Sequence, residues 1–375
     1  WFSARNYKWL WSSILRIGFA SNRLIVTQSR ISRIQDALQE GQSFYLTNLI
    51  NIRYLCGFTG SNGALLISKS KATLATDSRY DISSSQECFD VDIVIGRNLS
   101  ELLIAKDHSQ EIWFESANLT VAQLSALSEH FPKQKFVAKI GFVEAHRQVK
   151  DDAEIRSIRA ACEISVAAWH KTLGQIKVGK TERDIRNELE INLRTLGADD
   201  VAFNSIVATG PNSAIPHHEP TDREISKGDF LKIDFGAKLA GYHADCTRTI
   251  VLGKAADWQV EIYQALAQAQ AAGRSILSAQ ATYLAIETAV SDRLKASGHL
   301  DLFTHGLGHG VGLEIHENPF FGRGSQDKIE ENTVLTIEPG IYLRDRGGVR
   351  IEDTVVVTSE NYVNLTNLPY ELIEI

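Results

Sequence analysis

Residues 231–251 read LKIDFGAKLAGYHADCTRTIV, two β-branched runs that meet at AKLAG. This pattern is typical of a β-hairpin whose bend lies in the Gly-containing segment. A symmetric bend at the Leu239–Ala240 bond places Asp234 directly opposite Asp245. The Cβ atoms of directly opposed residues lie about 4.5–5.5 Å apart, so their like charges repel. Facing carboxylates among apolar neighbours need a cation between them or must share a proton; two unrelated acids on a solvated hairpin are the alternative.

Residues 335–357 repeat this arrangement as LTIEPGIYLRDRGGVRIEDTVVV, with turn residues at RGG. Glu338 takes the place of Asp234, and Glu352 takes the place of Asp245. A second hairpin with acids at matching places makes a solvated surface a poor explanation. We therefore expect the four carboxylates to belong to one site.

The chain has 375 residues, a length that suits two domains, and its composition is that of an ordinary globular protein. A net charge of −7 argues against a nucleic-acid or anionic-membrane partner. No apolar run approaches the roughly 18 residues of a membrane helix. The four cysteines show no metal-ligand spacing, which favours reduced thiols and a cytoplasmic location.

Residues 1–25 differ in character from the rest, because they combine several tryptophans with basic residues and contain no acid. We expect this segment to be a leader outside the folded domains. Residues 26–145 then show short strand-like runs separated by Gly, Ser and Asn turns, which indicates a small α/β domain. The polar segment 144–150 is expected to link it to a second domain, residues 146–375.

The second domain contains an internal repeat, residues 152–251 and 255–357. Each copy has two amphipathic helices, a loop with a histidine, and an acidic hairpin; Thr181 with Asp184 forms a candidate capping box in the first copy. Two such units would join their hairpins into one sheet around a pseudo-twofold axis, because each alone would leave an apolar face bare. The predicted class is α+β.

Histidines cluster in the glycine-rich segment THGLGHGVGLEIHENP, residues 304–319. A lone histidine is more often structural than functional. Here His305, His309 and His316 lie together, and His316 repeats the upstream His217. The absence of a strand–GxGxxG–helix context argues against a dinucleotide loop. We interpret this segment as part of the site.

Four carboxylates and an imidazole suit two divalent ions such as Mn²⁺, Co²⁺, Fe²⁺ or Zn²⁺, and not a thiolate zinc site. Paired ions of this kind activate a bridging water, which attacks a carbonyl without a Ser or Cys nucleophile. Arg350 lies two residues from Glu352 on one expected strand and shares its face. It is either a partner for the carboxylates or a clamp on substrate.

Several motifs resemble those of the M24 metallopeptidases, the pita-bread enzymes: KIDFGA, GYHADCTRT, HGLGHGVGLEIHE, TIEPGIY and VRIED. They are similar to the proline-specific branch of Xaa-Pro dipeptidase (prolidase) and aminopeptidase P. NIRYLCGFTGSNG and DSRY resemble the creatinase-type N-terminal domain of that branch. The metal ligands that the resemblance implies are Asp234, Asp245, His309, Glu338 and Glu352.

The resemblance also implies roles. The expected catalytic residues are His305, His316 and Glu338, and the expected substrate-binding residues are His217, His316 and Arg350. The expected cofactor is a pair of divalent ions, Mn²⁺ first, and the expected reaction is hydrolysis of an N-terminal Xaa-Pro bond by a metal-bridging hydroxide. The partners are a peptide with proline at P1′ and a second copy in a homodimer.

Other functions on the same fold stay open. A methionine-type or broad aminopeptidase usually lacks the N-terminal domain expected for residues 26–145. Creatinase is metal-free, and a non-catalytic pita-bread binding protein would have lost ligands. The choice between a dipeptidase and an aminopeptidase P depends on how the cleft closes beyond the second substrate residue.

Overall fold

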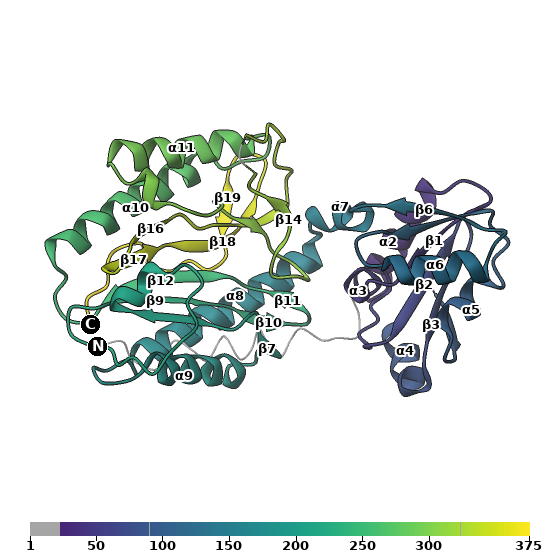
Figure 1. The fold of residues 1–375 in the computed structure, drawn as a ribbon, viewed down its shortest axis with the longest axis horizontal. Coiled ribbons are helices and arrows are strands. Elements are labelled where there is room, and N and C mark those ends of the chain that lie inside the picture. The colour runs from purple at the N-terminus through teal and green to yellow at the C-terminus, as the bar shows by residue number, and fades with distance from the viewer. Residues whose placement is uncertain (1–22, 90, 323) are drawn as a thin grey trace. The chain divides into compact units, whose positions relative to one another are not determined.

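The computed structural model describes residues 23–375 apart from positions 90 and 323. Contacts divide the chain into two compact units, and the division falls between Val143 and Glu144 (Figure 1). Most of the expected leader lies outside the described residues. Among the described residues, no helix has both the length and the apolarity that crossing a membrane requires.

The N-terminal unit is built on one mixed sheet with the strand order β4-β3-β2-β1-β5-β6. Its strands are β1 (Gln42–Leu46), β2 (Gly63–Ser68), β3 (Ala72–Thr76), β4 (Asp92–Ile95), β5 (Glu111–Glu115) and β6 (Lys135–Lys139). The helices that accompany them are α2 (Arg23–Ala37), α3 (Leu49–Cys56), α4 (Asp81–Glu87), α5 (Leu99–Ile104) and α6 (Val121–His130). This agrees with the α/β character expected for this region.

The segment expected to be a polar linker is mostly helical, since α7 spans Phe142–Gln148. Two of its charged residues are not solvated as a linker's would be. Arg147 and Lys150 are both buried and donate hydrogen bonds to Glu317. Two charges of this polar segment therefore have a buried acidic partner, a contact that the sequence did not indicate.

The C-terminal unit has a sheet with the order β14-β13-β15-β18-β12-β9-β8, and β19 pairs with β18. Its strands are β8 (Ile206–Thr209), β9 (Phe230–Phe235), β12 (Cys246–Val251), β13 (His309–Gly310), β14 (Glu317–Phe320), β15 (Val334–Ile337), β18 (Glu352–Val357) and β19 (Tyr362–Asn364). The two acidic hairpins meet at its centre, where β12 lies antiparallel to β18. This is the joined sheet that the repeat predicts.

Each half of this sheet has its own helix pair and its own apolar core. The pairs are α8 (Asp152–Leu173) with α9 (Glu182–Thr195), and α10 (Asp257–Ser275) with α11 (Tyr283–Ala296) (Figure 1). Trp169 of α8 stacks on Phe235 of β9, with ring centroids 5.6 Å apart. Ile286 and Val290 of α11 belong to the other core, together with Leu335 of β15. Thr181 and Asp184 form the predicted capping box of α9.

The contacts at the centre of the sheet repeat as well. The Thr247 hydroxyl donates to Glu352, and the Thr354 hydroxyl donates to the backbone oxygen of Asp245. Each threonine therefore bonds the acidic position of the other half. The pseudo-twofold arrangement expected from the sequence is confirmed.

The register of the first hairpin differs from the prediction. Asp234 lies opposite Thr247, and not opposite Asp245. The bend is formed by Ala240 and Gly241, which have φ of 50° and 84°, and its two arms are β10 (Ala237–Leu239) and β11 (Tyr242–His243). Two central residues with positive φ define a type I′ turn, whose twist matches that of the strands. A shift of two positions keeps each acid on its predicted face, because side chains alternate with a period of two.

The second hairpin bends two residues earlier than RGG. Its outer arms are β16 (Gly340–Leu343) and β17 (Gly347–Arg350), so the turn is Arg344 to Arg346. In this hairpin the register places Glu338 in line with Glu352, as the pairing of Gly340 with Arg350 requires.

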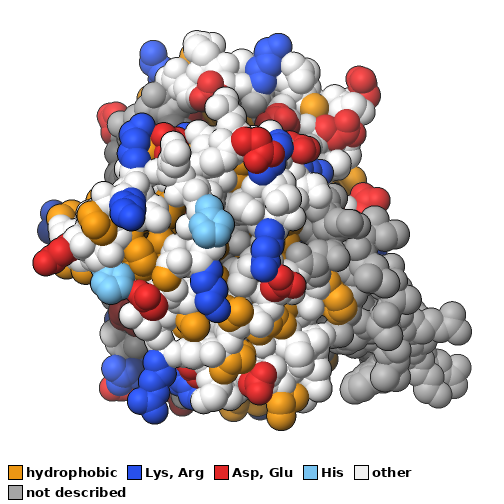
Figure 2. Space-filling view, turned by 90° about the vertical axis from the view of Figure 1, so that its right-hand side faces the viewer, with side chains coloured by type: hydrophobic (Ala, Val, Ile, Leu, Met, Phe, Trp, Pro, Cys, Tyr) orange, Lys and Arg blue, Asp and Glu red, His pale blue; other side chains and the backbone are white. Residues whose placement is uncertain are grey.

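Charged side chains are interspersed over the face of the molecule that Figure 2 shows, with Lys and Arg next to Asp and Glu. This mixture agrees with the modest net charge of the sequence.

The type I′ turn makes a prediction about stability. An L-residue in the left-handed region costs roughly 1–2 kcal/mol, and Asn tolerates that region better than most residues. Ala240→Asn should therefore raise the free energy of unfolding by up to about 1 kcal/mol. Ala240→Val should lower it, because a β-branched side chain fits positive φ poorly. Denaturant titration of both variants checks this, and a valine variant as stable as the parent would contradict the turn type.

Candidate metal centre

The acidic ends of the hairpins converge on one cavity of about 240 Å³ in the C-terminal unit. Asp234 is the next-to-last residue of β9, Asp245 precedes β12, Glu338 follows β15, and Glu352 begins β18. The cavity is lined by every predicted site residue except His305, namely His217, Asp234, Asp245, His309, His316, Glu338, Arg350 and Glu352. Convergence follows from the topology, because the central strands of both halves bring their acids to the same end of the sheet.

Three of these side chains form the tightest group. Single ligand atoms of Asp245, His309 and Glu352 all lie within 4.8 Å of one another. The Nε2 atom of His309 is 3.5 Å from an oxygen of Asp245 and 3.5 Å from an oxygen of Glu338. These distances are too long for good hydrogen bonds, and they leave room between the donor atoms.

The electrostatics of the cavity disfavour a full set of negative charges. Burial raises the pKa of Asp245 well above its ordinary value, and the charges of Asp234 and Glu338 raise it further. Burial, followed by the charges of Asp245 and Glu338, does the same to the pKa of Glu352. The pKa of Glu338 is also raised, mainly by burial. Carboxylates in this state must take up protons or bind cations.

Divalent cations fit these residues. The Oδ1 atom of Asp234 is buried and has no hydrogen-bond donor, although a buried acceptor without a partner is costly. An acceptor of this kind beside Asp245 suits a hard or borderline cation with oxygen ligands and one imidazole. The donor set is therefore suitable for metal, with Asp234, Asp245, His309, Glu338 and Glu352 as the available ligands.

The Arg350 side chain is held by hydrogen bonds to other residues of the protein. Its guanidinium bonds Asp234 and donates to the Thr247 hydroxyl at 3.0 Å, to the Tyr342 hydroxyl at 3.1 Å and to the backbone oxygen of Pro216 at 3.1 Å. These contacts match the first of the two expected roles, that of a partner for a carboxylate. Its expected contact with substrate stays a prediction.

His305 lies apart from the cavity and lines a second one, of about 390 Å³. Its Nδ1 atom is 2.8 Å from the backbone oxygen of Gly306, and its Nε2 atom is 2.9 Å from the Tyr342 hydroxyl. Burial lowers its pKa to about 4, so the ring is neutral near pH 7. A neutral ring that donates to Gly306 accepts from Tyr342, which links His305 to Arg350.

His217 and His316 reach the cavity from equivalent loops of the two halves, and both are exposed. Burial and the nearby His309 and His217 lower the pKa of His316. The adjacent His218 also borders the cavity, but it is buried, with Nε2 2.8 Å from an oxygen of Glu182. The structure thus gives the neighbouring histidines 217 and 218 different surroundings.

Sequence reasoning missed three contributors: Tyr342, the pair Thr247 and Thr354, and Glu182. The repeat of Asp-Cys-Thr as Glu-Asp-Thr contained a signal for the threonines. Tyr342 follows the acidic motif in EPGIY, but nothing local indicates that its hydroxyl connects a histidine to an arginine.

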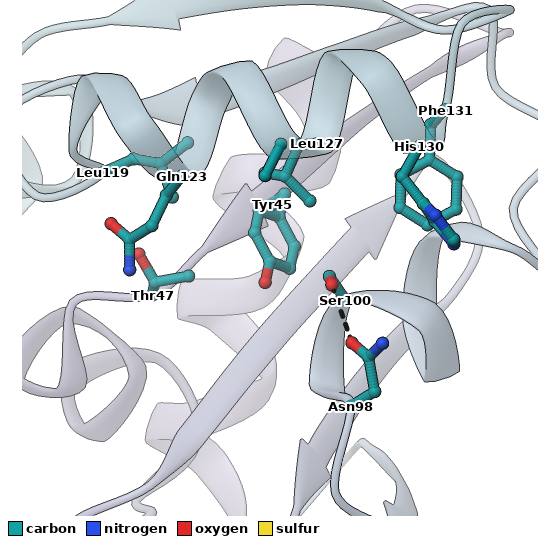
Figure 3. Close-up of a pocket in the computed structure, with 10 residues that line it drawn as sticks. Tyr45, Thr47, Asn98, Ser100, Leu119, Gln123, Leu127, His130 and Phe131 are labelled. Atoms are coloured by element: carbon teal, nitrogen blue, oxygen red, sulfur yellow. Dashed lines mark hydrogen bonds between the residues drawn. The ribbon is translucent and has the colours of Figure 1, made fainter.

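A third cavity, of about 360 Å³, lies in the N-terminal unit between β1, α5 and α6 (Figure 3). It is lined by Tyr45, Thr47, Asn98, Ser100, Leu119, Gln123, Ala126, Leu127, His130 and Phe131. None of these lining residues carries a carboxylate, so this cavity offers no carboxylate ligand for a metal.

Fold and site together define a metalloprotein with a carboxylate-rich centre. Residues 156–359 match the model of metallopeptidase family M24, and residues 30–149 match the creatinase/prolidase N-terminal domain. The chain therefore belongs to metallopeptidase family M24. It is an enzyme of the metallopeptidase class.

Among its relatives is the Xaa-Pro dipeptidase of Pyrococcus furiosus, which is 31% identical over 88% of this chain and 94% of the relative. Among solved structures, the Xaa-Pro dipeptidase from Bacillus anthracis is 37% identical, with a TM-score of 0.89 over 93% of this chain and 100% of the other. The X-Pro aminopeptidase from Thermotoga maritima is 34% identical, with a TM-score of 0.86 over 91% and 100%.

The raised pKa values of Asp245, Glu338 and Glu352 predict that ionisation of these carboxyl groups destabilises the folded protein when no metal is bound. An acid with a raised pKa in the folded state stabilises the fold at low pH and loses that contribution as pH rises. Glu352→Gln should therefore increase the melting temperature of chelator-treated protein near pH 7.5 by about 2–4 °C. The difference in melting temperature between Glu352→Gln and the parent should disappear as pH falls toward about 4.3, the ordinary pKa of glutamate.

Differential scanning calorimetry in chelator measures this effect. The exposed Glu331 provides a control, since Glu331→Gln removes one charge outside the cavity. A glutamine variant at position 352 that melts at or below the parent temperature would show that the carboxylates do not repel one another in the folded protein.

Proposed function

We propose that this enzyme hydrolyses the bond between the N-terminal residue and a following proline in dipeptides or short peptides. One observation carries the proposal: four carboxylates, three of them buried, converge with His309 on one cavity, in a chain of the M24 family. Relatives named Xaa-Pro dipeptidase and X-Pro aminopeptidase support the substrate class.

The proposed ligands are the five residues expected from the sequence, Asp234, Asp245, His309, Glu338 and Glu352. Two divalent ions held by these residues would activate a water for attack and would polarise the scissile carbonyl. We propose Mn²⁺ as the native ion, because carboxylate ligands predominate. Co²⁺, Zn²⁺ and Fe²⁺ suit the same donor set.

The protein's own groups handle protons and position the substrate. We assign Glu338 as the proton acceptor, because its carboxyl group borders the cavity beside the other proposed ligands. Its neighbour His309 is held 3.5 Å away. Arg350 orients Asp234 and, in our proposal, also faces the substrate.

The histidines are assigned to substrate. His217 and His316 lie on equivalent loops and are proposed to contact the peptide on either side of the scissile bond. His305 is proposed to assist the tetrahedral intermediate, with its tautomer fixed by Gly306 and Tyr342. A proline after the scissile bond leaves as a secondary amine, so its nitrogen must gain a proton. Glu338 can return the proton that it accepted from water, with His316 beside the leaving group.

Further features of the proposal concern the whole protein. We propose domain limits of 26–145 and 146–375, a homodimer as the working assembly, and the cytoplasm as its location. The four cysteines are free and buried, which supports a reducing compartment. The relatives carry both dipeptidase and aminopeptidase names, so the proposal includes both activities.

Metal removal should abolish activity. Exhaustive chelation is expected to reduce hydrolysis of Ala-Pro to background, and Mn²⁺, Co²⁺ or Zn²⁺ should restore it. Alkylation of thiols should leave activity intact, because the cysteines are buried and are not the nucleophile.

Asp245→Ala should lose metal and activity together, whereas His305→Ala should retain metal and lose about 10²–10³ in turnover.

Elemental analysis beside the kinetics separates these outcomes. Full activity after complete metal removal would exclude the proposed chemistry. A metal-free His305→Ala protein would show that His305 supports the ligands, and not the intermediate.

Proline at P1′ should be preferred over alanine by at least ~10-fold, which corresponds to about 1.4 kcal/mol of pocket contact. Rates on Ala-Pro and Ala-Ala, and on the same pair extended by two residues, measure the preference and also distinguish dipeptidase from aminopeptidase activity. Faster cleavage of the alanine substrates in both sets would leave only a two-metal aminopeptidase.

A further inference from the structure

The segment from Thr209 to Thr221 carries His217 into the cavity with little regular structure of its own. Apart from the short 3₁₀ helix Gly210–Ala214, it is irregular. Hydrogen bonds within the segment cannot fix an irregular loop in one conformation. Contacts from outside the segment must therefore hold His217 in place.

One buried side chain supplies five of these contacts. Glu182, the first residue of α9, is 0% exposed and accepts five hydrogen bonds. Its Oε1 atom accepts from the Thr209 backbone N–H at 2.8 Å and from the Asn212 side chain at 3.0 Å. Its Oε2 atom accepts from the backbone N–H and hydroxyl of Thr221, at 2.8 and 2.7 Å, and lies 2.8 Å from Nε2 of His218.

Only an ionised carboxylate satisfies this set of donors. Both oxygens of Glu182 face N–H or O–H groups, so an amide would direct its own N–H₂ at donors whichever way it turned. Burial opposes the charge, yet hydrogen bonds from His218, Thr209 and Thr221 outweigh it and lower the pKa of Glu182. The group is thus ionised at neutral pH and joins both ends of the segment.

The middle of the segment has a second anchor. Buried Lys232 donates to the backbone oxygens of Ile215 and Pro216 at 2.6 and 3.2 Å. Arg350 donates to the same Pro216 oxygen at 3.1 Å. His217 therefore lies between two fixed points, with Pro216 on one side and His218 on the other.

The second half of the domain uses the same device. His316 is exposed to the cavity, and the following Glu317 is buried. The carboxylate of Glu317 accepts from Arg147 at 2.5 Å and from Lys150 at 2.8 Å. In both halves, then, the residue after the cavity histidine is held inside the protein by an opposite charge or a charge-assisted hydrogen bond.

We propose that Glu182 is a positioning residue, which holds the segment 209–221 so that His217 faces the metal centre and contacts substrate. The inference rests on the proposed function only where it assigns His217 to substrate. The contacts of Glu182 with the loop stand independently of it.

The test compares two isosteric changes on the same helix. Glu182→Gln removes the buried negative charge that binds the loop. Glu188→Gln removes a negative charge that forms a partly exposed ion pair with Lys180. Glu182→Gln should raise KM for Ala-Pro at least tenfold with kcat changed less than threefold and metal content unchanged. Glu188→Gln should match the parent. A KM equal to the parent's in Glu182→Gln, or an equal rise in both variants, would overturn the positioning role.

A readout that needs no activity tests the loop directly. Hydrogen exchange of peptides covering 209–221 should be at least tenfold faster in Glu182→Gln, with exchange elsewhere unaltered. Unchanged exchange in Glu182→Gln would refute the anchoring, whether or not the parent enzyme cleaves Xaa-Pro peptides. Faster exchange in Glu182→Gln, together with a parent enzyme that cleaves no Xaa-Pro peptide, would refute the proposed function alone. Should Glu182→Gln fail to fold, Thr221→Val removes a single hydroxyl donor and should shift exchange and KM in the same direction by a smaller factor.

Discussion

Repulsion among four carboxylates in one cavity governs the centre of this enzyme. Burial already disfavours charge on Asp245 and Glu352, and the charges of Asp234 and Glu338 raise the cost of ionising these two groups further. The fold brings the four carboxylates together nonetheless, and a single imidazole lies close to two of them. Arg350 forms a direct ion pair with Asp234, and its charge offsets the repulsion at the other three carboxylates only in part. The cavity is therefore stable in its ionised form only with cations present, and this requirement links metal binding to the stability of the sheet centre.

The twofold construction of the sheet explains how such a cluster is built. β12 and β18 pair at the centre, and each brings a threonine against the acidic position of the other half. Each half contributes its own helix pair and core, so the apolar packing that stabilises the unit lies away from the acids. The carboxylates, whose charges repel one another, lie where the two halves of the sheet meet, and both halves hold them in place. The two histidine loops follow the same symmetry, and each is fastened by the residue that follows its histidine.

Much of this arrangement could be predicted because it repeats along the chain. The order of helix, helix, histidine loop and acidic hairpin identified the domain architecture, and the motifs around Asp234 and Glu338 identified the residues of the cavity. The register could not be predicted as readily. A bend at Ala240 and Gly241 requires positive φ at an alanine, a conformation that the residue type does not suggest.

Long-range polar contacts were beyond the sequence for a different reason. Glu182 looked like an ordinary first-turn acid of a helix, and its five donors come from positions 209–221, which no local pattern connects to it. The same holds for Arg147 and Lys150, which precede the repeat and whose partner Glu317 lies in its second half. His217 and His218 are adjacent in sequence, and only the fold separates the one that faces the cavity from the one that faces Glu182.

The central proposal is that two cations share the cavity between the hairpins. Anomalous diffraction from crystals of the Mn²⁺-loaded enzyme, collected on both sides of the manganese edge, tests this directly. We expect two peaks about 3.5–4 Å apart. They should lie among Asp234, Asp245, His309, Glu338 and Glu352. A single peak, or peaks outside this cavity, would contradict the account.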